Sequence, residues 1–238
     1  MTTLFISDLH LDLARPAILD QFESFIREEA VHADALYILG DLFEAWIGDD
    51  ADDPVGKRFV AAMKPMREAR RPCFFMHGNR DFLLGERFAR EAGMTLLPDP
   101  SVIDLYGTPT LLMHGDSLCT LDSDYQQFRR TARDPAWQSQ LLAQPLAQRR
   151  ALATRLRAMS REAGSMKSED IMDVTPAEVD RAMAAHGARQ LIHGHTHRPA
   201  RHESPAGLRW VLGAWEQCGW AIEAKIDEID LMNFNIYQ

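Results

Sequence analysis

The amino-acid sequence predicts an α/β fold in which helices flank two β-sheets and a helical cap is inserted into the chain. Three observations lead to this prediction. Strand-like segments alternate with helix-like segments in the first 94 residues, further strand-like segments follow, and one long helix-like stretch interrupts them. The chain has 238 residues, 46% of them hydrophobic, and is therefore long enough to bury a full core.

The first part of the chain predicts a parallel sheet. Three apolar segments, rich in β-branched and aromatic residues, end in polar turns as buried strands do: TLFISDLH, ADALYILGDLF and RPCFFMHGNRD. Residues 16–30 and 54–69 lie between them and have apolar residues at helical spacing. Each of these two segments begins with a proline, which suits the first turn of a helix. Strands that alternate with helices in this way pair in parallel.

The rest of the chain predicts a second sheet and the cap. SVIDLYGTPTLLMHGD favours a hairpin that turns near residues 107–109, and three later segments have strand character: LRWVLGAW, GWAIEAKID and IDLMNFNIY. A helical stretch from residue 123 to about residue 165 interrupts these strands. We therefore divide the chain into a core, residues 1–122 and 168–238, and an inserted helical cap, residues 123–167.

Charge and composition narrow the class of protein. A net charge of −9 argues against nucleic acid as a partner, because a general phosphate-binding surface needs many cations. Residues 124–167 nevertheless carry nine cations and three carboxylates. Three scattered cysteines favour a reducing cytoplasm. With no basic leader and no 18-residue apolar run, we expect a protein that is neither exported nor membrane-spanning.

Polar residues gather where the predicted strands end, in SDLH, GDLFE, GNRD, MHGD and HGHTH. Ligands of open α/β sheets bind at the carboxyl ends of strands, so we expect these segments to converge on one crevice. The candidate metal ligands are Asp8, His10, Asp41, Asn79, His114, His195 and His197. Their carboxylate, amide and imidazole groups suit manganese, iron or zinc. If Asp41 bridges two ions, the site is that of a two-metal hydrolase.

The order and spacing of these five segments resemble those of the calcineurin-like metallophosphoesterases. Most of that family has histidine where this chain has Arg80. Three features narrow the resemblance to one bacterial branch of the family: GNRD, the segment HGDSLCTLDSDYQQFR and the length of the insert. Members of that branch hydrolyse a UDP-linked diacylated glucosamine lipid in lipid A synthesis. The resemblance implies a layered β-sandwich flanked by helices and two manganese ions. It also implies peripheral association with the cytoplasmic face of the inner membrane, and we predict no protein partner.

The resemblance further implies a role for each site residue. One metal would be bound by Asp8, His10, Asp41 and His197, and the other by Asp41, Asn79, His114 and His195. The residues expected to contact substrate are Asn79, Arg80, Asp122, Ser160, Lys167 and His195. Gly164 occupies a position that is often a polar substrate contact in relatives, and it could instead end the cap helix.

Diphosphate chemistry gives Arg80 a role. Cleavage of a phosphate ester expels an alkoxide, which benefits from a general acid such as histidine. A diphosphate expels a phosphate, which needs no proton but does need its charge neutralised, and a guanidinium supplies directed donors for this. The alternative is a surface arginine that pairs with Asp81. We expect Asn79, Arg80 and His195 to be the catalytic residues, acting on a metal-activated water.

The predicted cap carries an apolar stripe with two interpretations. Its members are Leu142, Leu146, Leu152, Leu156 and Met159, with Arg149, Arg150, Arg157 and Arg161 between them. Most stripes of this kind are ordinary core. Above a diphosphate site, however, the stripe could hold acyl chains, and the basic face would favour an anionic membrane.

Several polar residues near the motifs are left out of the candidate site. His77 and His193 occupy strand positions that precede the turns, so we expect them in the core or behind the ligands. Asp116 could orient a histidine ligand or merely close a turn.

Two other classes of function stay open. The first is another metallophosphodiesterase, a nuclease, or a different nucleotide diphospho-sugar hydrolase. The second is a scaffold that keeps the fold without metals. The filled ligand positions argue against the scaffold, and the acidic body argues against a nuclease.

Overall fold

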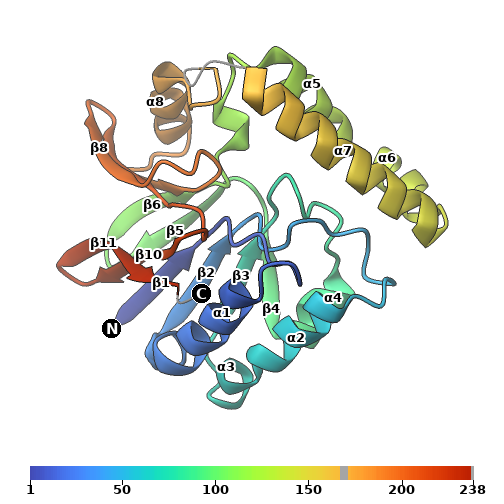
Figure 1. Cartoon of the computed structure of the whole chain (residues 1–238). Coiled ribbons are helices and arrows are strands. Elements are labelled where there is room, and N and C mark those ends of the chain that lie inside the picture. Colours follow the sequence, from blue (N-terminus) through green and yellow to red (C-terminus); the bar gives the residue numbers. More distant parts are fainter. Residues whose placement is uncertain (167–170, 237–238) are drawn as a thin grey trace.

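The computed structural model describes residues 1–166 and 171–236, which form two β-sheets packed face to face (Figure 1). The first sheet has the order β11-β10-β1-β2-β3-β4. Its strands are β1 (Thr2–Ile6), β2 (Ala35–Leu39), β3 (Cys73–Met76), β4 (Met94–Leu97), β10 (Cys218–Lys225) and β11 (Glu228–Asn235). Strands β1 to β4 pair in parallel, which confirms the predicted parallel sheet.

The second sheet has the order β5-β6-β7-β9-β8. Its strands are β5 (Ser101–Leu105), β6 (Thr108–Leu112), β7 (Gln190–His193), β8 (Ala200–Ser204) and β9 (Gly207–Val211). The predicted hairpin is confirmed, since β5 and β6 pair antiparallel around a turn in which Tyr106 and Gly107 have positive φ.

The two C-terminal strands correct one expectation. GWAIEAKID and IDLMNFNIY form β10 and β11, which extend the first sheet rather than the second. Strand β10 pairs antiparallel with β1, with Ile222 opposite Phe5, and both side chains are buried between the sheets. Alternation of apolar and polar residues identifies a strand, but it does not say which sheet edge the strand joins.

Helices cover the outer faces of both sheets (Figure 1). The first sheet packs on α1 (Pro16–Glu28), α2 (Pro54–Ala62), α3 (Lys64–Glu68) and α4 (Glu86–Ala92), and α8 (Pro176–Ala185) packs on the second. Short 3₁₀ helices span Ala30–His32 and Asp116–Leu118. The single helix predicted over residues 54–69 is wrong. It is two helices that meet at Met63, where Pro65 lacks the N–H that would continue the first.

Three helices lie beyond the carboxyl ends of the strands: α5 (Ser123–Ala132), α6 (Pro135–Leu142) and α7 (Leu146–Met166) (Figure 1). The stretch predicted to be helical from residue 123 to about 165 therefore breaks twice, at residues 133–134 and at residues 143–145. The Asp134 side chain caps α6 by accepting from Trp137 N at 2.8 Å. The division into core and cap remains a prediction.

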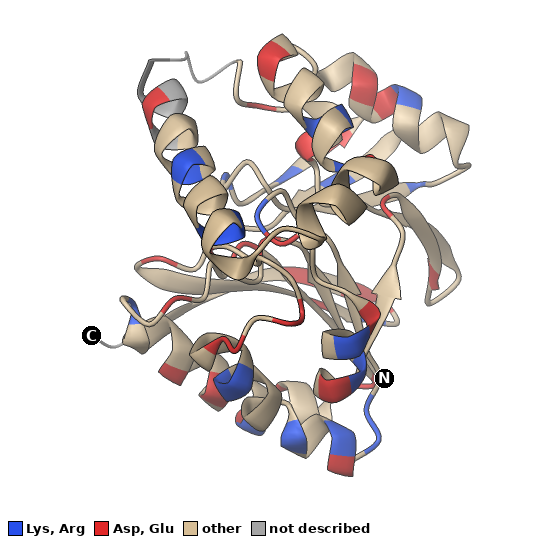
Figure 2. Cartoon of the chain, turned by 90° about the vertical axis from the view of Figure 1, so that its right-hand side faces the viewer, with Lys and Arg blue, Asp and Glu red and all other residues tan. Residues whose placement is uncertain are grey.

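Two further observations bear on the cap. Helix α7 continues to Met166, so Gly164 lies inside the helix and does not end it. Figure 2 shows basic residues at intervals along α7, all of them arginine, and both signs of charge on the helices of the first sheet. No helix in residues 1–166 or 171–236 is both long and apolar enough to cross a membrane.

Candidate active site

The candidate ligands sit in loops that directly follow strands of both sheets. Five of them have left-handed backbone conformations, with φ of 56° at Asp8, 49° at His10, 51° at Asp41, 67° at His195 and 56° at His197. Such conformations are uncommon for residues other than glycine, and they gather at functional sites. The backbone therefore turns sharply at these residues.

Two glycines let these loops approach one another. A Cβ on Gly78 would lie 2.1 Å from Oδ1 of Asp41, and one on Gly194 would lie 2.2 Å from Oδ2 of Asp8. Both distances are far below any real contact, so a side chain at either glycine would displace a carboxylate. The glycines of GNRD and HGHTH thus allow the loops to close around Asp8 and Asp41.

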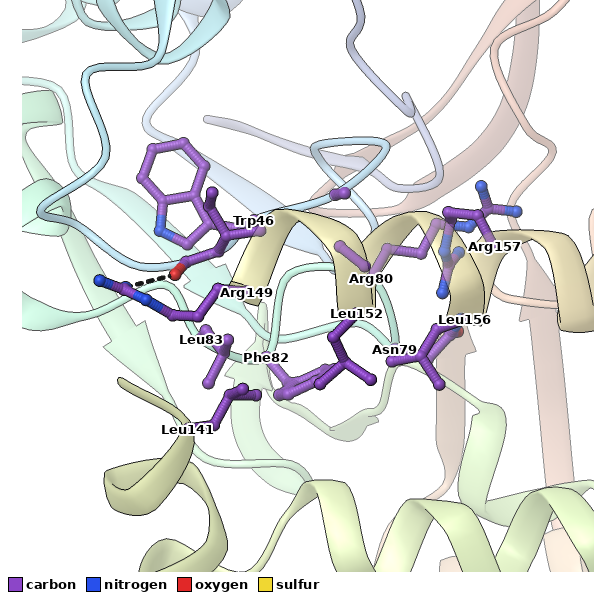
Figure 3. Close-up of a pocket in the computed structure, with 13 residues that line it drawn as sticks. Trp46, Asn79, Arg80, Phe82, Leu83, Leu141, Arg149, Leu152, Leu156 and Arg157 are labelled. Atoms are coloured by element: carbon purple, nitrogen blue, oxygen red, sulfur yellow. Dashed lines mark hydrogen bonds between the residues drawn. The ribbon is translucent and has the colours of Figure 1, made fainter. Parts of the chain in front are cut away.

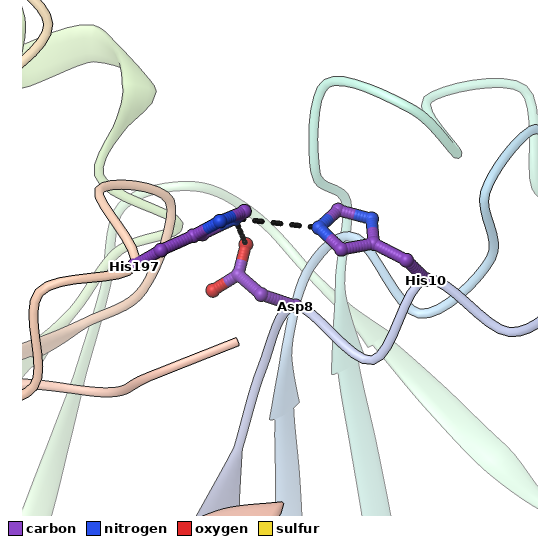
Figure 4. Close-up of side chains that lie close together, drawn as sticks. All are labelled: Asp8, His10 and His197. Carbon is purple, nitrogen blue, oxygen red and sulfur yellow. Dashed lines mark hydrogen bonds and ion pairs between the residues drawn. The ribbon is translucent and has the colours of Figure 1, made fainter. Parts of the chain in front are cut away.

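Asp8, His10 and His197 form the first cluster (Figure 4). Nε2 of His10 lies 3.3 Å from Nε2 of His197, which lies 3.4 Å from Oδ1 of Asp8. Oδ2 of Asp8 accepts hydrogen bonds from Ser7 Oγ at 2.6 Å and from His195 N at 2.9 Å. Oδ1 is buried without a hydrogen-bond partner. A carboxylate oxygen left free beside two imidazole nitrogens fits a divalent cation.

Asp41, Asn79, His114 and His195 form the second cluster. Oδ1 of Asn79 lies 3.0 Å from Nε2 of His114 and 2.9 Å from Nδ1 of His195. Nε2 of His114 is also 3.8 Å from Oδ1 of Asp41. The Nδ1 atom of His114 faces the backbone oxygen of Leu39 at 2.8 Å, and this contact fixes the ring. Amide, carboxylate and imidazole donors thus converge here as well.

Electrostatics prepares most of these groups to bind cations. Burial lowers the pKa of His10 to about 3 and that of His195 to about 4, so both imidazoles are neutral at pH 7. Burial would also lower the pKa of His114, but Asp41, Asp116 and Asp8 outweigh it and raise this pKa to about 9. Burial opposes ionisation of Asp8, yet the His197 ring, 3.4 Å from its Oδ1, and the nearby imidazoles of His114 and His10 hold its pKa well below the usual range.

A pocket of about 490 Å³ opens beside the two clusters, under α5 and α7. It brings together five of the predicted substrate contacts: Asn79, Arg80, Asp122, Ser160 and His195. Gly164 lies near the end of α7, and Lys167 lies outside the described residues. The structure thus places five of the seven at one cavity, and their roles remain a prediction.

Arg80 does not form the alternative surface pair with Asp81. Its Nη1 donates to Oε2 of Glu44 at 2.5 Å, and its Nε lies 3.5 Å from Oδ2 of Asp41. The Asp81 carboxylate is fully buried and accepts from the backbone N–H groups of Leu42 and Gly78, both at 2.7 Å. Asp81 therefore holds the loops in place, while Arg80 faces the pocket.

The pocket also includes Tyr125, which the sequence analysis did not single out, and Arg157, which it named only among the arginines of the cap. The Tyr125 ring lies 5.7 Å from the ring of His195, and its hydroxyl donates to Oδ2 of Asp116 at 2.6 Å. The Nη1 atom of Arg157 is buried without a hydrogen-bond partner. Burial and the charge of Arg80 both lower the pKa of Arg157. Two guanidinium groups held close together on one cavity indicate an anion site.

The residues of the apolar stripe of the cap do not all face the same pocket. Leu152 and Leu156 face a narrow pocket of about 30 Å³ between α7 and the core, with Trp46, Phe82, Leu83 and Leu141 (Figure 3). Leu156 and Met159 line the larger pocket. Leu142 and Leu146 line neither of these two pockets.

The sequence suggested that Arg149 belongs to an exposed basic face, but the structure shows it buried. Its side chain is 3% exposed, and it donates to the Asp50 carboxylate and to the backbone oxygen of Ile47 at 2.6 Å. Gly48 leaves room for this guanidinium, since a Cβ there would lie 2.4 Å from its Nη1. Arg149 thus fastens α7 to the loop that precedes α2.

The residues left out of the site contact other groups than the candidate ligands. His193 is fully buried, and burial lowers its pKa to about 3. Nε2 of His77 contacts the backbone oxygen of Leu84 at 2.7 Å. The Asp116 carboxylate accepts from Tyr125 and from Nε of Arg129 at 2.9 Å, so it binds α5 rather than orienting a histidine ligand.

Comparison with known proteins agrees with this geometry. The sequence model of the calcineurin-like phosphoesterase family matches residues 1–199. A UDP-2,3-diacylglucosamine hydrolase of Cellvibrio japonicus is 55% identical over 240 residues, covering 99% of this chain and 100% of that protein. The protein of the same name from Escherichia coli K12 is 53% identical over 98% of this chain and 99% of its own length. A solved archaeal phosphodiesterase, 12% identical over 98% of this chain and 100% of that chain, has a TM-score of 0.50, which shows likeness of fold alone.

Proposed function

Because this chain belongs to the calcineurin-like phosphoesterase family, we propose that it is the hydrolase that cleaves the diphosphate of UDP-2,3-diacylglucosamine. The products are UMP and 2,3-diacylglucosamine 1-phosphate. The carrying observation is that Asn79, Arg80 and His195 face one pocket beside two clusters of metal-binding groups. The chain is 52–55% identical to hydrolases of that name over nearly its whole length, which supports the substrate.

The two clusters would hold two divalent ions, for which Mn²⁺ is the choice we propose. Asp8, His10, Asp41 and His197 would bind one ion, and Asp41, Asn79, His114 and His195 the other. Such ions neutralise phosphoryl oxygens and lower the pKa of a water so that it can attack phosphorus. The free Oδ1 of Asp8 and the mixed oxygen and nitrogen donors support this assignment.

The side chains around the pocket would bind and orient the diphosphate. Arg80 and Arg157 neutralise its oxygens, and Asn79 and His195 contact it from the metal side. The phosphate that leaves is a weak base, so no general acid is needed in its place. The further substrate contacts that we propose are Asp122, Ser160, Gly164 and Lys167.

The acylated end of the substrate would lie against α5 and α7. Phe128, Leu156 and Met159 give the large pocket an apolar side that no diphosphate needs. The narrow pocket beside Leu152 is too small for an acyl chain as it stands, so a chain that enters there must move side chains of α7.

Such a lipid substrate resides in a membrane, and we propose peripheral association with the cytoplasmic face of the inner membrane. Two exposed apolar side chains near the pocket support this, Leu121 at 60% and Met159 at 53%. The net positive charge of residues 124–167 favours anionic head groups. No partner protein or nucleic acid is needed for this function.

A substrate panel with the purified protein and Mn²⁺ tests the proposal. UDP-2,3-diacylglucosamine, UDP-glucosamine, a cyclic nucleotide and single-stranded DNA would be compared at equal concentration. We expect the acylated diphosphate to be hydrolysed fastest, and a chelator to abolish the reaction. Faster hydrolysis of the cyclic nucleotide or DNA would instead establish the phosphodiesterase or nuclease alternative.

A further inference from the structure

Glu44, the last residue of the GDLFE segment, lies at the candidate site without a part in the proposed chemistry. Its Oε2 atom accepts from Nη1 of Arg80 at 2.5 Å. Nδ1 of His10 and Nη2 of Arg15 are 3.8 Å and 3.7 Å from the same oxygen, beyond hydrogen-bond distance. The side chain of Glu44 is 26% exposed. Arg80 is therefore the group that Glu44 binds.

The backbone around this pair is already fixed. Glu44 N donates to the backbone oxygen of Leu11 at 3.2 Å, which ties its loop to the loop after β1. Arg80 N donates to Oδ1 of Asp41 at 2.9 Å, and the backbone oxygen of Arg80 accepts from Trp46 N at 3.1 Å. What remains to be fixed in Arg80 is the rotation of its long side chain.

The guanidinium of Arg80 is only partly occupied by Glu44. It has five N–H donors in a rigid plane, and Glu44 takes one of them. Its Nε is buried without a hydrogen-bond partner. Because Arg80 lines the large pocket with Asn79 and His195, donors remain available there for a phosphate.

Arg80 would otherwise be drawn to other partners. Oδ2 of Asp41 lies 3.5 Å from its Nε, so without Glu44 the guanidinium could turn fully onto this proposed metal ligand. Arg157, which lines the same pocket, repels the guanidinium of Arg80, as the lowered pKa of Arg157 reflects. The contact with Glu44 therefore holds the Arg80 side chain in one orientation.

We propose that Glu44 is a positioning residue that holds the Arg80 guanidinium in the orientation in which it receives the diphosphate. The inference rests on the proposed function, because it assigns Arg80 to the diphosphate. Glu44 touches neither substrate nor metal in this account and acts only through Arg80. The alternative is an ion pair of the kind that contributes little at a protein surface.

A double-mutant cycle tests this assignment with UDP-2,3-diacylglucosamine and the Mn²⁺-loaded protein. We expect Glu44→Ala to lower kcat about 30-fold and Glu44→Gln about 10-fold, since glutamine keeps the shape but loses the charge. KM and metal content should stay within about twofold of wild type. The double variant Glu44→Ala/Arg80→Ala should be no slower than Arg80→Ala, because Glu44 has no role without Arg80.

Glu23→Gln is a matched control. Glu23 accepts from Nε of Arg58 at 2.5 Å and is 33% exposed, so it makes the same kind of contact between α1 and α2, away from the pocket. Its kcat should equal that of wild type. Thermal unfolding of all variants would identify any loss that comes from misfolding.

The outcomes separate the inference from the function. Wild-type kcat in Glu44→Ala, or losses that multiply in the double variant, would overturn the positioning role while leaving the proposed function intact. Equal slowing in Glu23→Gln would also overturn it. A wild-type protein that does not hydrolyse UDP-2,3-diacylglucosamine would refute the proposed function, and the inference with it.

Discussion

The apolar side of the large pocket makes a quantitative prediction about acyl-chain recognition. Leu156 and Met159 line it from α7, and Met159 is 53% exposed in the free protein. Full burial of a leucine or methionine side chain contributes about 1.5 to 3 kcal/mol, so covering the open half of Met159 contributes about 1 kcal/mol and covering the smaller exposed part of Leu156 about 0.5 kcal/mol. Serine at both positions should therefore cost about 1.5 kcal/mol, roughly a 10-fold loss of kcat/KM.

The assay compares two substrates and one control variant. UDP-2,3-diacylglucosamine should show the full loss, while Mn²⁺-dependent hydrolysis of a short aryl phosphodiester should be nearly unchanged, because that ester has no acyl chain. Leu142→Ser is the control, since Leu142 is 40% exposed and lines neither pocket described above. Equal losses on both substrates would mean that Leu156 and Met159 only support the fold, and the acyl-binding interpretation would be wrong.

Three further predictions concern the metals and α7. Asp41→Ala should empty both metal sites and abolish activity, whereas His197→Ala should affect mainly one; elemental analysis showing two ions in Asp41→Ala would contradict the bridge. Because its pKa is about 9, His114 must lose a proton when a metal ion binds, so metal affinity should rise about tenfold per pH unit between pH 7 and pH 9. If calorimetry showed a metal affinity that does not change with pH, His114 would not be a ligand. Arg149→Met should lower the unfolding free energy by about 1 to 2 kcal/mol in urea titrations, and an unchanged midpoint would mean that its bonds to Asp50 and Ile47 add nothing.

The metal-binding groups could be predicted because each belongs to a short segment at the end of a strand. Parallel strands carry their ends to one edge, so Asp8, Asp41 and Asn79 meet whatever the details of the loops. His114 and His195 reach the same place because β6 and β7 are adjacent and parallel in the second sheet. Local pattern and sheet topology together determine this part of the site.

Other features depend on contacts between distant segments and could not be predicted. No local pattern marks Tyr125 as a pocket residue or separates Arg157 from the other arginines of the cap, since only the packing of α5 and α7 over the core brings them to His195 and Arg80. Burial of Arg149 follows from Asp50, 99 residues away in the chain. The sheet that β10 joins likewise depends on its pairing with β1, which lies near the other end of the chain.

Product analysis in labelled water tests the central claim most directly. The wild-type protein would be incubated with UDP-2,3-diacylglucosamine and Mn²⁺ in water enriched in heavy oxygen, and the products identified by mass spectrometry. The account predicts UMP and 2,3-diacylglucosamine 1-phosphate, with a single heavy oxygen on the phosphate of only one of them, and no products after the metal is removed. Release of UDP and the free diacylated sugar, or turnover that survives complete removal of metal, would contradict it.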